Sequence, residues 1–178
     1  MRISSRKPWF RGGRRRPGFI LTVSALALLA LAASLTSMPL LIWNASASAP
    51  IGLYRRIDGP LQRGNLVLAW LPAGARELAA ERGYLPRNVP LVKRVAGLAG
   101  DVVCAEGATV FINGKLVTTR VKADKKGHPL PAWEGCNLLQ PGDVFLLMGD
   151  VPASFDGRYF GVVGRRQLIG RLVPLWTK

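Results

Sequence analysis

The sequence predicts a mainly β domain with antiparallel strands behind one N-terminal transmembrane helix. Residues 19–43 contain no charged side chain, and this run exceeds the roughly 20 residues that a membrane-spanning helix needs. Residues 44–178 instead hold many short apolar runs separated by Gly and Pro, with one short helical pattern. That alternation is typical of an antiparallel β domain. About 135 residues follow the apolar run, which is enough for one domain with its own core.

The arm before the apolar run, residues 1–18, carries seven basic residues and no acidic one. A basic arm beside an apolar run is expected to stay in the cytoplasm, so residues 44–178 are expected on the other side. The run is longer than the apolar core of about 7 to 15 residues in a cleavable signal peptide, which favours a retained anchor. Its small residues, such as Leu-Ala-Ala-Ser, keep a removed signal peptide open as the alternative.

The net charge of +15 invites a nucleic-acid interpretation. Seven of the basic residues, however, lie in the arm beside the apolar run, where they fit a topology signal. We therefore expect no nucleic-acid partner, and we expect membrane lipid around residues 19–43.

The first half of the domain combines strands with one helix. Residues 76–82, rich in Ala, Glu and Arg, are expected to form a short helix that Gly83 closes. A turn is expected at Asp58-Gly59-Pro60. Extended segments are expected at residues 52–57, 65–71, 91–95 and 101–103.

The second half continues as strands and turns. Residues 109–117 carry Asn113-Gly114 between apolar runs, which is a strong hairpin signal. Residues 121–131 are expected to form a polar loop, and residues 144–148 a buried strand after the turn Gln-Pro-Gly-Asp. Residues 159–163 and 167–174 are expected to close the domain.

The chain has two cysteines, Cys104 and Cys136. Two cysteines in an exported domain usually pair. Their bridge would close a loop of about 32 residues and stabilise the fold by roughly 3 to 4 kcal/mol in the chain-entropy model. Two cysteines without a nearby histidine make a poor metal site. We therefore expect a disulfide, no metal and no cofactor.

Histidine chemistry is not indicated. The single histidine, His128, lies in a polar stretch, whereas a Ser-His-Asp enzyme needs a histidine ordered against its serine. The chain also contains no His-Glu-x-x-His metal motif, no phosphate-binding P-loop and no Gly-x-Ser-x-Gly elbow.

Residues 44–54 place two serines, Ser46 and Ser48, just before Pro50. Ser/Ala/Pro stretches are usually linkers. As an active site the pattern also makes physical sense, because a serine held in an irregular turn presents its hydroxyl and its own backbone N–H together. The hydroxyl two residues earlier would be a second donor to an oxyanion.

Residues 90–101 contain a lysine in an apolar strand. Leu91, Lys93 and Val95 share one face of an extended strand, which places an amine among apolar neighbours. Desolvation lowers the pKa of a lysine and makes it a neutral base near pH 7. Spacing alone favours the other interpretation, a strand whose Lys93 or Arg94 points to water.

Residues 148–161 form a turn-rich segment after a strand, with two acids and an arginine. Functional sites often lie on such loops, although surface turns look alike.

The three segments, in this order, resemble the type I signal peptidases. The second reads Lys-Arg-Val-Ala-Gly-Leu-Ala-Gly-Asp, and the third ends in Asp-Gly-Arg-Tyr-Phe-Gly. More closely, residues 46–54, Ser-Ala-Ser-Ala-Pro-Ile-Gly-Leu-Tyr, look like the serine box of the TraF conjugative-transfer peptidases. Residues 129–136 and the short anchor point the same way, and the resemblance covers about residues 39–174.

The resemblance assigns roles to individual residues. Ser48 matches the nucleophile, Lys93 the general base, and Ser46 the serine whose hydroxyl joins the Ser48 backbone N–H in the oxyanion hole. Asp156 matches an acid implicated in TraF activity, and Arg158 is expected to be structural. Two departures from ordinary signal peptidases favour the TraF branch. One residue rather than two separates the serine from Pro50, without a methionine, and Gly157 replaces the usual serine.

The resemblance also implies a signal-peptidase fold, a serine endopeptidase activity and a location. The expected location is the bacterial inner membrane, with a single pass and the peptidase domain, residues 44–178, in the periplasm. The implied partners are a propilin substrate and a conjugation, or type IV secretion, machinery. Some members of the branch join the ends of the pilin into a ring, and the sequence leaves open whether this one does.

Three other functions stand beside this interpretation. A general signal peptidase would process many exported proteins. A self-cleaving Ser/Lys repressor would carry a DNA-binding head, whereas this chain has an apolar run in that place. A non-enzymatic assembly factor of conjugation would lack a reactive serine.

Overall fold

The structure, a computed structural model, describes residues 21–28 and 39–178. It divides the chain into two compact units, Met1–Ser37 and Met38–Lys178. Residues 21–28 are helical, but within the described residues no helix is both long and apolar enough to cross a membrane. Residues 19, 20 and 29–38 of the apolar run, and all of the basic arm 1–18, lie outside the described residues. The anchor therefore stays a prediction.

One boundary of that prediction differs from the structure. Residues Leu41–Asn44 form strand β1 rather than the end of a helix. β1 pairs antiparallel with β2 (Gly52–Ile57), and Trp43 stacks on Trp176 with ring centroids 5.9 Å apart. The apolar run thus continues into the folded domain. The sequence did not show this, because a short apolar strand without charges has the same composition as the end of a membrane helix.

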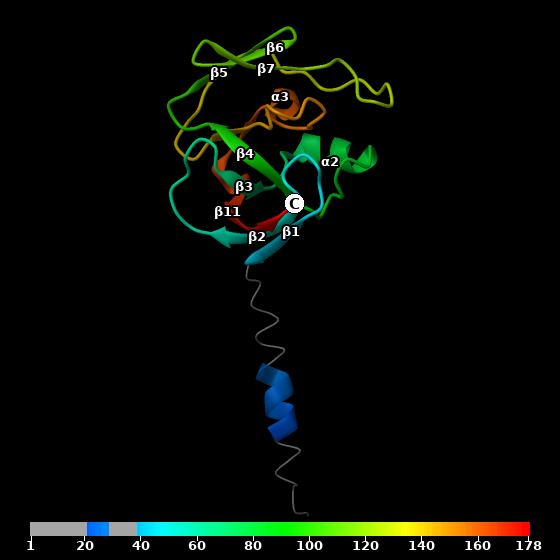
Figure 1. Cartoon of the computed structure of the whole chain (residues 1–178), viewed down its shortest axis with the longest axis vertical. Helices are drawn as coiled ribbons and strands as arrows, with labels where there is room; N and C mark the ends of the chain where they lie inside the picture. The colour runs from blue at the N-terminus through cyan, green and yellow to red at the C-terminus, as the bar shows by residue number, and fades with distance from the viewer. Residues whose placement is uncertain (1–20, 29–38) are drawn as a thin grey trace, which may run out of the picture. The chain divides into compact units, whose positions relative to one another are not determined.

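The second unit contains two antiparallel sheets, as the sequence predicts (Figure 1). The larger has seven strands in the order β1-β2-β11-β3-β4-β9-β10, and the smaller has four in the order β7-β6-β5-β8. The remaining strands of the larger sheet are β3 (Leu66–Ala69), β4 (Leu91–Gly97), β9 (Val144–Leu146), β10 (Val162–Val163) and β11 (Leu168–Thr177). The smaller sheet consists of β5 (Val102–Glu106), β6 (Thr109–Ile112), β7 (Lys115–Thr119) and β8 (Gly135–Leu138).

Helices are few among the described residues. α2 (Ala73–Glu81) begins three residues before the predicted helix and ends where Gly83 takes a positive φ of 69°. α3 (Gly157–Phe160) is a single turn that Asp156 caps, where the sequence suggested only a closing segment. A 3-10 turn, Arg165–Gln167, leads into β11.

Several sequence predictions are confirmed in the strands. β2 has the predicted bounds, and the hairpin between β6 and β7 turns at Asn113 and Gly114, whose φ values are 52° and 76°. Positive φ at both turn positions matches the twist of the strands, and Asn-Gly tolerates it best. β1 and β8 were not anticipated, because neither shows a strict alternation of buried and exposed residues.

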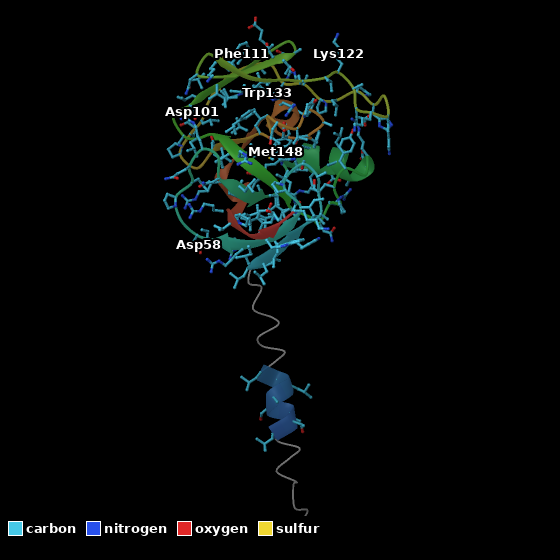
Figure 2. All side chains as sticks on the ribbon, viewed as in Figure 1. Asp58, Asp101, Phe111, Lys122, Trp133 and Met148 are labelled. Atoms are coloured by element: carbon cyan, nitrogen blue, oxygen red, sulfur yellow. A yellow bond between two sulfur atoms is a disulfide. The ribbon has the colours of Figure 1, made fainter. Side chains whose placement is uncertain are left out.

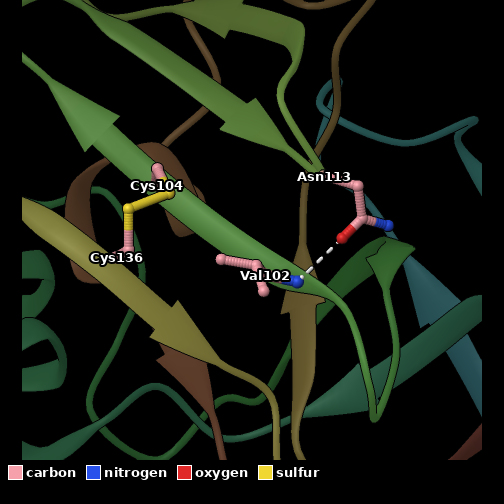
Figure 3. Close-up of a disulfide and its surroundings, with 4 residues drawn as sticks. All are labelled: Val102, Cys104, Asn113 and Cys136. Carbon is pink, nitrogen blue, oxygen red and sulfur yellow. Dashed lines mark hydrogen bonds between the residues drawn. A yellow bond between two sulfur atoms is a disulfide. The ribbon is translucent and has the colours of Figure 1, made fainter.

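The predicted disulfide is present. Cys104 on β5 and Cys136 on β8 lie opposite each other in the strand register and are bonded (Figure 3). In the same view Val102, two residues earlier on β5, donates its backbone N–H to Asn113 Oδ1 at 2.9 Å. The bridge therefore ties the edge strand β8, which is exposed along its whole length, to the middle of the smaller sheet.

The two sheets share a core. Phe145 and Leu147, from β9 and the residue that follows it, pack with Val103, Val110 and Ile112 of the smaller sheet. Asp101 links the sheets at another point, because it accepts from Arg63 of the larger sheet's loop and from Asn113 at 2.8 Å. Asp101, at the end of the second sequence segment, therefore helps to hold the two sheets together.

Candidate active site

The turn that carries the two serines is organised by one buried asparagine. Asn44, at the end of β1 and 5% exposed, donates its side-chain amide to the carbonyls of Ser46, Ala49 and Pro50 at 3.0 to 3.1 Å. Its side-chain oxygen accepts from Ser46 N at 3.1 Å. Tyr54 of β2 donates its hydroxyl to Pro50 O at 2.6 Å. The sequence analysis missed Asn44, although a lone polar residue at the end of an apolar run is a signal for such a cap.

Ser48, Lys93 and Ser154 meet beside this turn. Lys93 Nζ lies 2.7 Å from Ser48 Oγ and 2.8 Å from Ser154 Oγ. Lys93 belongs to β4, opposite Val67 of β3, so the sheet fixes its backbone. The sequence analysis assigned Ser48 and Lys93 to one site and did not single out Ser154, a 2% exposed hydroxyl in the third segment.

Burial changes the protonation of Lys93. Only 4% of the residue is exposed, and its strand neighbours Leu91 and Val95 belong to the apolar core. Desolvation lowers the pKa of Lys93 to about 8, because removing water penalises the charged amine; the nearby Asp156 opposes this shift and Arg158 adds to it. The structure thus favours a buried lysine over the solvent-facing one that spacing alone suggested.

Ser46 lies next to Ser48. The two hydroxyl oxygens are 2.9 Å apart, and Ser48 donates its backbone N–H to Ser46 Oγ at 3.3 Å. Ser46 Oγ therefore contacts both the hydroxyl and the backbone N–H of Ser48, and the oxyanion-hole role that the sequence analysis expected for these donors stays a prediction.

Asp156 is fully buried and does not contact Lys93 through a hydrogen bond among the described residues. Its carboxylate accepts from Met148 N at 3.1 Å, and from the backbone, Nε and Nη2 of Arg158 at 3.2, 2.8 and 3.1 Å. Both residues of this ion pair are at most 2% exposed. Asp156 therefore acts on Lys93 through its charge and through the loop that it holds.

Arg158 fixes the loop that carries Ser154. Its guanidinium donates to the carbonyls of Met148, Val151 and Pro152 at 2.9 to 3.3 Å. A further contact, at 3.4 Å, reaches Thr119 O at the end of β7 in the smaller sheet. The structural role expected for Arg158 is consistent with these contacts, and the loop is held from both sheets.

Gly157 has no room for a side chain. A Cβ there would lie 2.6 Å from Leu146 O and 2.8 Å from the ring of Phe145. On the other side Trp133, labelled in Figure 2, donates its indole N–H to Gly157 O at 3.0 Å. The glycine that departs from the signal-peptidase pattern is thus required by its own neighbours in this chain.

The serine pair opens into a cavity of about 930 Å³. Its wall is largely apolar and includes Leu68, Leu71 and Phe155 besides Ser48 and Lys93. His128 is not part of this lining; its ring nitrogen Nδ1 lies 3.0 Å from Asp124 Oδ2 on an exposed loop. The structure therefore keeps the histidine apart from the serines.

Residues 15–176 match the family of signal peptidases, peptidase S26. The chain belongs to this family. Within it, the chain is 37% identical over 144 residues to the plasmid transfer protein TraF of Escherichia coli, covering 75% of this chain and 81% of that protein. A conjugal transfer protein TraF from Agrobacterium fabrum is 32% identical over the same shares. A probable signal peptidase I-2 of Synechocystis is 36% identical over 48% of this chain and 38% of its own.

Family membership puts the geometry in context. The resemblance to TraF-type S26 peptidases that the motifs carried is thereby confirmed, and the matched region includes all three sequence segments. The matched region contains Ser48 and Lys93, whose side chains are 2.7 Å apart, and both residues line the cavity.

Proposed function

We propose that this protein is a serine endopeptidase in which Ser48 is the nucleophile and Lys93 the general base. The observation that carries the proposal is the 2.7 Å distance between Lys93 Nζ and Ser48 Oγ. A neutral lysine offers one lone pair to the Ser48 hydroxyl proton, while one of its own N–H bonds donates to Ser154 Oγ, 2.8 Å away. Burial supports this state, because it disfavours the charged amine.

The reaction follows from these positions. Ser48 Oγ attacks a peptide carbonyl as its proton passes to Lys93 Nζ, and the oxyanion accepts from Ser48 N and the Ser46 hydroxyl. The charged lysine then returns the proton to the leaving amine, and an acyl-enzyme on Ser48 remains. Water, or a second amine, gives a proton to Lys93 as it attacks this ester, and Lys93 passes that proton to Ser48 Oγ as the bond to the acyl group breaks. A water gives a free acid, and an amine at the other end of the same substrate gives a ring.

The proposed substrate is the pilin precursor of a conjugation system. Relatives named for plasmid and conjugal transfer match this chain along most of its length, which supports this class of substrate over a broad set of exported proteins. The family itself favours a second candidate, a general signal peptidase that removes leader peptides.

The proposed location is the inner membrane, single pass, with residues 44–178 in the periplasm. The charge-free run 19–43 and the basic arm before it support this placement, and the disulfide is consistent with an oxidising compartment. A reporter that is active only in the periplasm, fused to the C-terminus, should be active. Activity of a reporter that works only in the cytoplasm would contradict the proposal.

A comparison of strains tests the function. In cells that carry the conjugation system, the mass of the pilin should change from precursor to mature form with the native chain and stay at the precursor mass with Ser48→Ala. A survey of exported proteins in the same two strains separates the candidates. Uncleaved leader peptides on many proteins would favour the general signal peptidase, and a defect confined to the pilin would favour the conjugative one. Mature pilin in the Ser48→Ala strain would reject both.

A further inference from the structure

The cavity that Ser48 and Lys93 line is largely apolar, but one part of its wall carries charged residues. Residues 123–130, which we call the strap, contribute Ala123, Asp124, Lys125, Lys126 and Leu130 to its lining. The strap precedes β8 and lies far from the serine turn in sequence. It therefore reaches the cavity as a separate piece of chain, and it can select substrates without taking part in the bond cleavage.

The strap is tied down at several points. Within it, Asp124 N donates to His128 O at 2.9 Å, Gly127 N donates to Asp124 O at 3.0 Å, and Ala123 bridges to Pro129. Outside it, the Tyr84 hydroxyl donates to the Asp124 carboxylate, and Arg82 Nη1 donates to Pro129 O at 2.8 Å. Its backbone is thus anchored to the segment after α2, and its lysines project from a fixed position.

The charges around the cavity are unequal. Apart from the general base Lys93, the lining contains three cations and one anion: Arg82, Lys125, Lys126 and Asp124. The anion is already engaged, because Asp124 also accepts from the backbone N–H groups of Lys126 and His128 at 2.8 and 2.9 Å. Lys125 and Lys126 are exposed and have no such partner among the contacts of the described residues. They face a largely apolar groove with unmatched positive charge.

We propose that Lys125 and Lys126 select substrates that carry a carboxylate near the cleaved bond. The proposal rests on the peptidase function above and adds the chemistry of the substrate. The carboxylate belongs either to an Asp or Glu side chain or to a free C-terminus that enters the cavity, and both would meet the same two amines. The apolar remainder of the wall accommodates the rest of the peptide.

The strap offers a matched control. Lys122 directly precedes the strap, is exposed, and does not line the cavity. In Figure 2 its side chain points outward at the edge of the domain. Replacing it removes one positive charge from the same region, against two in the strap variant, while leaving the cavity wall intact. Lys122→Gln is therefore compared with the double variant Lys125→Gln/Lys126→Gln.

The first experiment uses a random decapeptide library and the full-length protein. Cleaved products are sequenced by mass spectrometry, and cuts made by Ser48→Ala are subtracted. Asp, Glu or a C-terminus close to the cut should be enriched over its frequency in the library with the native chain and with Lys122→Gln. The enrichment should vanish with Lys125→Gln/Lys126→Gln, whose thermal unfolding should match that of the native protein.

The second experiment separates the two sources of the carboxylate. For the best peptides, Glu→Gln and C-terminally amidated versions are synthesised. The version that removes the recognised group should raise KM by roughly 2- to 20-fold with little change in kcat, since exposed charge pairs contribute modestly. That increase should shrink at 0.5 M salt, a concentration chosen so that screening is strong.

The outcomes are distinct. Ser48-dependent cuts without carboxylate enrichment, or with enrichment that survives in the double lysine variant, would overturn the role of the strap and leave the peptidase function in place. An absence of any Ser48-dependent cut, in this library and on the pilin precursor alike, would reject the peptidase function and this proposal together. If the carboxylate enrichment fell equally in Lys122→Gln and in the double variant, the effect would come from general surface charge, and the proposal would be overturned.

Discussion

The side-chain nitrogen of Lys93 lies 2.7 Å from the hydroxyl oxygen of Ser48, although 45 residues separate them in the chain. The first prediction tests this pair. Ser48→Ala should reduce cleavage to background while the fold persists. Lys93→Arg keeps the positive charge but supplies no neutral base, so its activity should be nearly as low as that of Lys93→Ala. Cleavage rates of the purified variants on one peptide measure both effects.

The same series contains graded controls. Ser46→Ala should lower the rate by about 10²- to 10³-fold, because one oxyanion donor is lost. His128→Ala should stay within about threefold of the native rate, since loop substitutions away from a site usually change little. If His128→Ala abolished cleavage while Lys93→Arg kept it, a histidine mechanism would replace the Ser/Lys one.

The second prediction concerns pH. The reaction needs neutral Lys93, whose pKa is lowered by burial to about 8. The value of kcat/KM should therefore rise with pH and level off above about 8, and at pH 6 it should be roughly 100-fold below the plateau. A profile measured from pH 5 to 10 on an uncharged peptide gives the apparent pKa. A rate that falls as pH rises through this range would contradict a lysine base.

The same shift affects stability with a definite sign. Between about 8 and the ordinary 10.5, folded Lys93 binds fewer protons than unfolded Lys93. The free energy of unfolding should gain from this residue as pH rises through that window and lose the gain as pH falls through about 8. Lys93→Met should lack this contribution.

The third prediction concerns Asp156. Asp156→Asn leaves the buried Arg158 without its counter-charge, and breaking a buried ion pair costs about 3 to 5 kcal/mol. Urea unfolding of the full chain should show this loss. Asp150→Asn, an exposed acid in the same loop, should change stability by no more than about 0.5 kcal/mol. Lost activity at unchanged stability would instead assign Asp156 a direct part in the reaction.

The fourth prediction concerns Gly157. Gly157→Ala places a methyl group against Leu146 O and Phe145, and overpacking of this kind costs about 1 to 3 kcal/mol. Gly74→Ala is the matched control, because a Cβ in that helical position meets nothing within 4 Å. It should be neutral or stabilising by about 0.4 to 1 kcal/mol. Equal effects of the two substitutions on the unfolding temperature would show that the close packing at Gly157 carries no cost.

The fifth prediction concerns the disulfide. The double variant Cys104→Ser/Cys136→Ser releases β8 and should cost roughly 3 to 4 kcal/mol in stability. The rate of the fraction that remains folded should change much less, since neither cysteine lines the cavity. Thiol titration of protein made in an oxidising compartment should find no free thiol in the native chain. If the folded fraction of the double variant also lost most of its cleavage rate, β8 would have a direct effect on the geometry of the site.

The sequence predicted the site better than the edges of the fold. Ser48 and Lys93 were assigned through the resemblance of three ordered segments to a known family, because the residues alone favoured a linker around Ser48 and a lysine that points to water. Ser154 was missed because a serine in a turn-rich loop has no local signature. Only tertiary packing brings it to Lys93, 61 residues away.

The misplaced boundary at residue 43 has a similar cause. Strand β1 and a membrane helix are both apolar and uncharged, so local composition does not separate them. What decides is the partner strand β2, with which Leu41–Asn44 pairs residue by residue. The helical turn α3 was missed because its four residues are too few for a periodic pattern. Asp156 caps this turn by accepting from Arg158 N, but in the sequence it is only an acid that precedes a glycine.

The last strand of the domain supports the serine turn from far along the chain. Lys178 donates its backbone N–H to Ile51 O at 2.9 Å, and a side chain at Gly52 would collide with Trp176 O, 2.1 Å from its Cβ. Trimming of residues 176–178 by a carboxypeptidase would therefore remove the brace beneath the nucleophile while sparing every residue of the site. For protein production, an affinity tag joined directly to Lys178 risks the same disturbance, and a flexible spacer ahead of the tag is the safer arrangement.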